Sequence, residues 1–248
     1  MKNVFVQTRN AKAFITAMRE SERMQGEPVL LAFYGPAGRG KTETTRYFAA
    51  QEGWTYCRCG KGWQQSELWM LQDLCVELQI DPVPRRKKPA FEAIVARLNA
   101  RPVPVIIDEA DKMPEGLLEW VRDFVDITAV PFALIGEKLL KRKMEKERRV
   151  WSRTLRLVEF APISTKDILF FAKEATRDED RGFNGILLTA NQGSMIARAA
   201  EGDFRPVKRH VFFIEELLRV NNSNTVTDEM VKMAIKKESK ERKYVPGL

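Results

Sequence analysis

A glycine-rich segment with one lysine and one threonine is the first place where residue types and spacing predict chemistry. It fits the pattern G-x-x-x-x-G-K-[ST], between an apolar run over 29–34 and a stretch of helical composition over 42–50. Glycines let successive backbone N–H groups turn inward around an anion, and the following helix adds its positive N-terminal end. We therefore expect a phosphate-binding loop, with the lysine on the terminal phosphates and the threonine hydroxyl on Mg²⁺. The predicted nucleotide-binding residues are Gly35, Pro36, Ala37, Gly38, Arg39, Gly40, Lys41, Thr42 and Glu43.

A second motif supplies the carboxylates that such a loop needs for hydrolysis. The apolar run over 103–107 ends in Asp108 and Glu109. Buried parallel strands have this composition, and open α/β sheets bind ligands at the carboxyl ends of their strands. We expect Asp108 to hold Mg²⁺ together with Thr42, and Glu109 to act as general base on the attacking water, with Lys41 on the phosphates. The alternative is a strand that ends in a solvated acidic turn, but the phosphate loop upstream favours a nucleotide-hydrolysing site.

Length and composition limit the classes of protein that this chain can represent. Its 248 residues are enough for one large domain, or for one medium domain with a small one, and 44% hydrophobic with 31% charged residues is ordinary for a soluble protein. No apolar run has the length of a membrane span, and the first residues lack a signal-peptide core. Three cysteines (Cys57, Cys59 and Cys75) and one histidine argue against a disulfide framework and a zinc site. We expect a cytoplasmic protein without a membrane partner.

An excess of basic residues predicts a polyanionic partner. The formal net charge is +8 and the sequence pI is about 9.4. Residues 138–158 hold nine Lys or Arg against two Glu, residues 232–243 hold six against two, and the block 85–88 is framed by prolines that predict an exposed loop. Any one block alone can be a solvated face, but three together favour duplex DNA, bound through its backbone without strong sequence preference. The sequence leaves open which block faces DNA. The candidate DNA-binding residues are Lys61, Arg85, Arg86, Lys87, Lys88, Lys141 and Arg142.

The order of apolar and helical segments predicts an α/β fold with a parallel five-stranded αβα sandwich, followed by a small C-terminal helical lid domain. We expect the nucleotide-binding domain to cover residues 1–161 and the lid, with its basic tail, residues 162–248. The expected strands are 29–34, 54–58, 103–108, 131–135 and 155–160. The expected helices are 42–50, 66–78, 89–99, 114–126, 165–176, 185–190, 206–219 and 227–237.

These motifs together resemble a known superfamily. "GPAGRGKT", "VIIDEAD" and the C-terminal helical region resemble the P-loop NTPases of the AAA+ class. Softer stretches resemble the phage Mu transposition protein B and Tn7-type target-selector ATPases. They are "PRRKKPAFEAIVARL", "IIDEADKMPEGLLEWVRDF", "FALIGEKLL" and "RRVWSRTLRL", and the resemblance covers residues 4–240. It implies an ATPase that uses ATP and Mg²⁺ and hydrolyses ATP to ADP and phosphate.

The resemblance also implies roles for residues outside the two motifs. "RRVWSR" is similar to the segment that presents an arginine finger to the nucleotide of a neighbouring subunit, which makes Arg153 the first candidate and Arg148 and Arg149 the next. The alternative for each is a surface or DNA-facing arginine. Arg205 is similar to the arginine that reaches from the lid to the phosphates. Glu137 stands at the sensor-1 position, where the family usually has an Asn or similar polar residue, so γ-phosphate sensing there stays open.

For the whole protein the resemblance implies ATP-dependent assembly into a homo-oligomeric helical filament or ring on duplex DNA. Such an assembly delivers target DNA to a transposase, which in turn stimulates hydrolysis. A helicase loader or replication initiator of the same superfamily is the first alternative. A nucleotide switch that does not hydrolyse is the second, and Lys41, Asp108 and Glu109 argue against it. Guanine specificity is disfavoured because no N-K-x-D segment is present.

Overall fold

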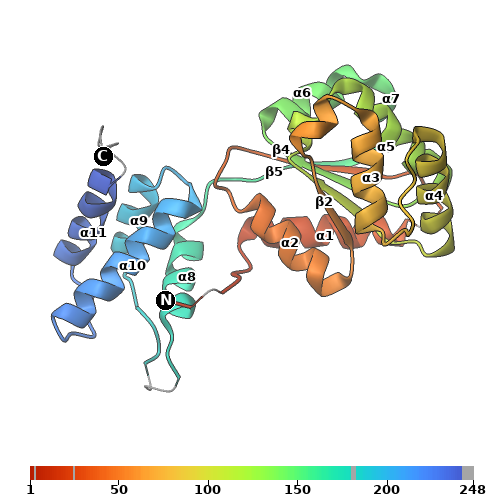
Figure 1. Cartoon of the computed structure of the whole chain (residues 1–248). Coiled ribbons are helices and arrows are strands. Elements are labelled where there is room, and N and C mark those ends of the chain that lie inside the picture. Colours follow the sequence, from red (N-terminus) through yellow and green to blue (C-terminus); the bar gives the residue numbers. More distant parts are fainter. Residues whose placement is uncertain (3, 25, 180–182, 242–248) are drawn as a thin grey trace, which may run out of the picture. The chain divides into compact units, whose positions relative to one another are not determined.

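The computed structural model describes the chain except for residues 3, 25, 180–182 and 242–248. It contains two compact units (Figure 1). The sheet unit consists of Asn10–Pro36 and Gly40–Phe160. The helical unit consists of Met1–Arg9, Ala37–Arg39 and Ala161–Leu248. Among the described residues, no helix is both long enough and apolar enough to span a membrane.

Five parallel strands form the sheet, in the order β2-β3-β4-β1-β5. Every side chain of β1, β3 and β4 is buried, because these central strands carry neighbours on both edges and helices on both faces. The predicted α/β class and parallel sheet are confirmed, and each strand lies within two residues of its predicted bounds. The strands are β1 (Leu30–Tyr34), β2 (Thr55–Arg58), β3 (Val105–Asp108), β4 (Phe132–Gly136) and β5 (Thr154–Glu159).

Helices cover both faces of the sheet. On one face Phe14 of α1 (Arg9–Arg23) packs against Phe33 of β1, with ring centroids 4.6 Å apart, beside α2 (Lys41–Glu52). On the opposite face Phe124 of α5 (Glu115–Thr128) stacks on Phe132 of β4 at 6.0 Å. Helices α3 (Glu67–Glu77) and α4 (Lys87–Ala100) complete that second layer, with Leu71, Leu74 and Ile94 in the same core. Helix α1 has no counterpart among the predicted elements.

Helix α4 corrects the predicted loop at the basic block 85–88. Arg86 is the extended N-cap residue, and Lys87 and Lys88 form the first turn of the helix. Pro89 does not prevent this, because the N–H groups of a first helical turn have no intrahelical partner to lose. The remaining short elements of this unit are η1 (Lys61–Gln64), η2 (Ala110–Lys112), α6 (Lys138–Lys146) and α7 (Arg148–Trp151).

In the described part of the helical unit, four helices surround a core that includes Phe171, Val207 and Ile214. They are α8 (Thr165–Thr176), α9 (Ala190–Ala199), α10 (Phe204–Val220) and α11 (Asp228–Glu241). Capping boxes start two of them, with Ser164 as the N-cap of α8 and Thr189 as the N-cap of α9. The predicted basic tail continues to residue 243, and its last two residues lie outside the described chain.

The predicted helix over 185–190 is wrong. Gly185 has φ +86°, and its Cα lies so close to the backbone of Lys173 that a Cβ would meet Lys173 O at 2.0 Å. The backbone N–H of Ile186 donates to Thr176 Oγ1 (2.7 Å), so this segment bonds to α8 rather than to itself. The helix begins only at Ala190, after its Thr189 cap.

We predicted one domain over residues 1–161 and a second over 162–248, but two short segments of the first range lie in the helical unit. Residues 1–9 belong to the helical unit, because the N–H of Lys2 donates to Ala175 O (2.6 Å), the N-terminal ammonium pairs with Glu215 (2.9 Å), and Val6 lies in the helical core. Residues 37–39 also belong to it, because Gly38 O accepts a hydrogen bond from the N–H of Phe204.

Candidate nucleotide-binding site

The predicted phosphate loop connects the carboxyl end of β1 to the start of α2. Gly40 is the N-cap of α2 with φ +84°, a left-handed conformation that favours glycine, and a Cβ there would meet nothing within 4 Å. The Lys41 ammonium donates to Gly35 O (2.7 Å) and Pro36 O (2.9 Å), so it lies over the start of the loop. The loop therefore combines an open helix N-terminus with a cation held by backbone oxygens.

The tip of the loop makes its contacts within the helical unit. Gly38 O accepts a hydrogen bond from the N–H of Phe204 (2.8 Å). The Asp203 carboxylate packs so closely on Gly38 that a Cβ would meet Asp203 Oδ1 at 2.0 Å, which requires glycine here. Nε and Nη1 of Arg39 are buried, and no described group accepts a hydrogen bond from them. Such donors fit an anionic ligand.

Asp108 and Thr42 meet although they come from separate motifs. Asp108 ends β3 with 2% of its surface exposed, and its Oδ2 accepts from Thr42 Oγ1 at 2.7 Å. The same oxygen accepts from the Tyr56 hydroxyl (2.8 Å), and Oδ1 accepts from the N–H of Glu109 (2.8 Å). Burial, together with the charge of Asp108, raises the pKa of Tyr56 well above its ordinary value, so the hydroxyl keeps its proton. Two hard oxygens side by side are the donors that Mg²⁺ prefers.

The Glu109 carboxylate forms ion pairs with two cationic side chains. Its Oε1 accepts from Arg58 Nη2 (2.5 Å), and its Oε2 pairs with Lys112 Nζ. Partial burial alone would raise the pKa of Glu109, but the hydrogen bonds from Lys112 and Arg58 outweigh it and hold that pKa below its ordinary value. Both carboxylate oxygens are thus engaged, and the group is a carboxylate at neutral pH.

The residue after β4, Glu137, is the exposed N-cap of α6. Its backbone N–H donates to Asp111 Oδ1 (3.1 Å). Lys143 secures the same region from α6, because its ammonium donates to the carbonyls of Asp111 (2.7 Å) and Met113 (2.6 Å). The structure thus brings the β3 and β4 ends together through Asp111.

The candidate arginine-finger residues differ in their surroundings. Arg153 forms a two-point ion pair with Asp126 of α5, with Nε–Oδ1 at 2.7 Å and Nη2–Oδ2 at 3.1 Å. Arg148 and Arg149 are exposed on α7. Arg205 is exposed in the first turn of α10, where its N–H donates to the Asp203 cap (2.8 Å).

The candidate DNA-binding residues lie on several elements of the sheet unit. Exposed Lys61 is in η1, and Arg85 and Arg86 are exposed before α4, where no described residue pairs with either guanidinium. The other candidates have neighbours of their own. Lys87 pairs with Glu67 (2.9 Å), Lys88 with Glu92 (3.8 Å) and Lys141 with Glu145 (3.7 Å), while Arg142 is exposed on α6.

Three residues that contact the acidic motif were not predicted: Tyr56, Arg58 and Lys112. Tyr56 and Arg58 lie on β2, which pairs with β3 in the register Arg58↔Asp108. Strand order decides this neighbourhood, and the order β2-β3 is not readable from either segment alone. The contact of Lys112 could have been predicted from the sequence, because residues three apart in a helical turn lie side by side and Lys112 follows Glu109 by three residues.

Comparison with known proteins identifies the type of domain that holds this site. The AAA domain family matches residues 24–144, which include the predicted phosphate loop, Asp108 at the end of β3 and Glu109 directly after it. Residues 24–144 of this chain thus resemble an AAA domain. The predicted AAA+ fold is confirmed with it, and so is the helical C-terminal region.

Two curated relatives confirm the predicted resemblance to phage Mu B-type proteins. The ATP-dependent target DNA activator B of Escherichia phage Mu is 30% identical over 162 residues, which are 65% of this chain and 49% of the relative. The Mu-like prophage FluMu DNA transposition protein B of Haemophilus influenzae is 27% identical over 131 residues, 50% of this chain and 46% of the relative. The chain spans about half the length of these relatives.

A solved structure with the same fold is the Aeropyrum pernix ORC2 protein in its ADPNP–ADP complexes. Its TM-score is 0.67 at 14% sequence identity, over 99% of this chain and 72% of that one. At this identity the likeness is one of fold, so it does not favour the replication-initiator alternative.

Proposed function

We propose that this AAA+ chain binds and hydrolyses ATP. The observation that carries the proposal is the 2.7 Å contact between Thr42 Oγ1 and Asp108 Oδ2, which joins the phosphate loop to the acidic strand. Lys41, now on two loop carbonyls, would exchange them for the terminal phosphate oxygens. Thr42 and Asp108 would hold Mg²⁺, which supplies positive charge to the phosphates when bound.

Glu109 is the proposed general base. It follows Asp108 directly, and its backbone N–H is already bonded to Asp108 Oδ1. Because Arg58 and Lys112 each hold one of its oxygens, Glu109 can accept a proton from water only after one of these cations moves away. Turnover thus includes a rearrangement of this ion-pair group.

The wider proposed function is target-DNA delivery in transposition, in the host cytoplasm. The names of the Mu and FluMu relatives support it, and the net charge of +8 supports binding to duplex DNA. We infer that ATP promotes assembly of copies of this chain into a filament or ring on DNA, which a transposase then engages. A nucleotide shared between subunits makes assembly depend on ATP, because the ligand stabilises the interface.

Arginines from a neighbouring copy would complete a shared site. Arg153, Arg148 and Arg149 are the candidates on the sheet unit, and Arg205 is the candidate on the helical unit. Arg153 can serve only after it leaves Asp126, whereas Arg148 and Arg149 are exposed. A helicase loader or replication initiator remains the alternative, and a pull-down with transposase or with a replicative helicase separates the two.

Phosphate release tests the enzymatic part of this proposal. Wild-type protein with ATP, Mg²⁺ and duplex DNA is expected to release phosphate, and Lys41→Ala to release none and to bind no nucleotide. Lys12→Ala, an exposed change on α1, is the matched control and should behave as wild type. A wild-type protein that binds ATP and releases no phosphate would support the nucleotide-switch alternative instead.

A further inference from the structure

Tyr56 contacts Asp108 of the acidic motif, although it belongs neither to that motif nor to the phosphate loop. It lies on the edge strand β2, and its hydroxyl donates to Asp108 Oδ2 at 2.8 Å. Asp108 is buried, so a donor lost at this oxygen is not readily replaced by bulk water. A carboxylate turns easily about its last torsion, and fixed donors therefore decide which way its oxygens point.

Thr42 and Tyr56 are the described side chains that donate to Asp108, and Tyr56 is the one for which we propose no contact with nucleotide or metal. Thr42 also donates to Oδ2, but its own oxygen is a proposed Mg²⁺ ligand. The N–H of Glu109 holds the other oxygen, Oδ1. Tyr56 is therefore the side chain that can keep Oδ2 in place while Thr42 turns towards the metal.

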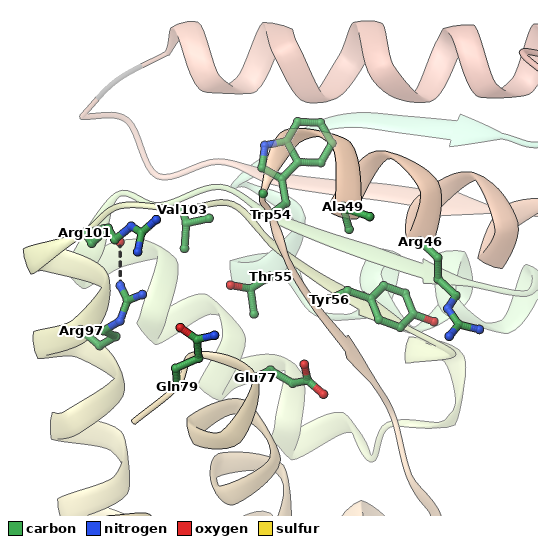
Figure 2. A pocket seen from close by; sticks show the side chains of 12 residues that line it. Arg46, Ala49, Trp54, Thr55, Tyr56, Glu77, Gln79, Arg97, Arg101 and Val103 are labelled. Carbon is green, nitrogen blue, oxygen red and sulfur yellow. Dashed lines mark hydrogen bonds between the residues drawn. The ribbon is translucent and has the colours of Figure 1, made fainter. Parts of the chain in front are cut away.

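The ring of Tyr56 is held at the wall of a surface pocket of about 670 Å³ in the sheet unit. Figure 2 shows Tyr56 and Arg46 on one side of this pocket and Arg97 and Arg101 on the other. The Arg46 guanidinium lies 5.9 Å from the centre of the Tyr56 ring, within the range of a cation–π contact. The ring is thus secured from α2 while the hydroxyl reaches Asp108.

We propose that Tyr56 is a positioning residue, whose hydroxyl fixes the orientation in which Asp108 holds the divalent cation of the bound nucleotide. The inference rests on the proposed nucleotide site, and it assigns to Tyr56 an effect on metal affinity rather than on nucleotide contact. Loss of the hydroxyl leaves the ring, its Arg46 contact and the strand unchanged.

Tyr56→Phe tests this with Mn²⁺ as the probe. We expect the affinity of the protein–ADP complex for Mn²⁺, measured by electron paramagnetic resonance, to fall about tenfold, the size of one hydrogen bond to a charged group. The Mg²⁺ concentration for half-maximal ATP turnover should rise by a similar factor, while KM for ATP at saturating Mg²⁺ stays within about twofold of wild type. Tyr34→Phe is the matched control, because it removes a tyrosine–carboxylate hydrogen bond (to Glu159, 3.3 Å) elsewhere in the sheet.

Unchanged Mn²⁺ affinity in Tyr56→Phe would overturn the proposal, whether or not turnover falls. The resonance measurement does not depend on hydrolysis, so a wild-type protein without ATPase activity would refute the proposed function and leave this test readable. If Tyr56→Phe does not fold, Arg46→Met replaces it. That change removes the cation over the Tyr56 ring and should weaken Mn²⁺ binding two- to threefold. Wild-type Mn²⁺ affinity in Arg46→Met would contradict the proposal.

Discussion

Thr42 Oγ1 lies 2.7 Å from Asp108 Oδ2, although 66 positions separate the two residues along the chain. The parallel order β3-β4-β1 brings the carboxyl ends of β1 and β3 to one edge of the sheet, with β4 between them. Thr42 begins α2, directly after the loop that follows β1, and Asp108 is the last residue of β3. The topology thus creates the proposed metal site from two motifs that are far apart along the chain.

Glu109→Gln should separate nucleotide binding from hydrolysis. The amide keeps the shape of the side chain but cannot accept a proton from water, so we expect ATP turnover to fall at least ~10²-fold while ATP binding persists. Phosphate release and equilibrium nucleotide binding measure the two effects. Glu92→Gln on the exposed side of α4 is the control. Wild-type turnover in Glu109→Gln would refute the proposed base.

Arg153 can be tested for a role beyond its ion pair with Asp126. Arg153→Ala and Asp126→Asn both break that pair, but only the first removes the guanidinium. If Arg153 acts on a neighbouring nucleotide, Arg153→Ala should abolish turnover of the assembled protein and Asp126→Asn should retain it. Each change should lower the free energy of unfolding by no more than about 1 kcal/mol, as for an exposed pair.

Mixing experiments identify the subunit that supplies the arginine. Arg153→Ala combined with Lys41→Ala should regain part of the activity, because one copy brings the arginine and the other an intact loop. The same mixtures with Arg148→Ala and Arg149→Ala rank the candidates. Absence of recovery in every mixture would argue against a shared site.

Buried thiols predict a loss of stability at alkaline pH. Burial raises the pKa of Cys59 to about 11 and that of Cys75 to about 11. At pH 7 and below these thiols are neutral in both states. As pH rises from about 9 to 11 the unfolded chain ionises first, so the free energy of unfolding should fall, by about 2 kcal/mol per thiol.

Thermal melts of the wild type and of a Cys59→Ala, Cys75→Ala double variant check this pH dependence. The comparison isolates the thiols from other groups that titrate in the same range. The variant should lose less stability between pH 9 and 11 than the wild type does. Parallel pH profiles would show that the two thiols do not contribute.

The salt dependence of DNA binding should identify the basic block that faces DNA. Arg85 and Arg86 are exposed without a described partner, whereas Lys87 and Lys88 pair with Glu67 and Glu92. Removing both arginines is expected to reduce the slope of log K against log salt by about 1 to 2 per subunit, since each phosphate contact contributes ~0.9. Lys141→Ala with Arg142→Ala tests the α6 block in the same way, and Lys12→Ala on α1 is the control. If neither block alters the slope, DNA contacts lie elsewhere.

Sequence patterns predicted the strands and the two motifs because those features are local. Continuous apolar runs such as 30–34 and 105–107 are buried on both faces, and the residues after them are Gly35 and Asp108, at the carboxyl ends where ligands bind. Helix α5 was similarly readable, since Leu117, Leu118, Val121 and Val125 recur on one face, and all four are buried.

Features that depend on tertiary contacts were not readable in the same way. The segment 185–189 has helical composition in part, but Gly185 packs on Lys173 and Thr189 caps the helix that follows. The placement of Tyr56 and Arg58 beside the acidic motif follows from the pairing of β2 with β3. Only the folded sheet brings these side chains to Asp108 and Glu109.

The affinity for duplex DNA in different nucleotide states tests the proposed function most directly. A single subunit with a few phosphate contacts should bind with a Kd of about 10⁻⁴ to 10⁻⁶ M, and assembly with ATP should tighten binding by aligning many such contacts on one duplex. Fluorescence anisotropy should therefore show tight binding with ATP and Mg²⁺ in the wild type and in Glu109→Gln, and weak binding with ADP, without nucleotide, or in Lys41→Ala. Equal affinity for DNA in all of these states would contradict an ATP-dependent DNA-binding AAA+ protein.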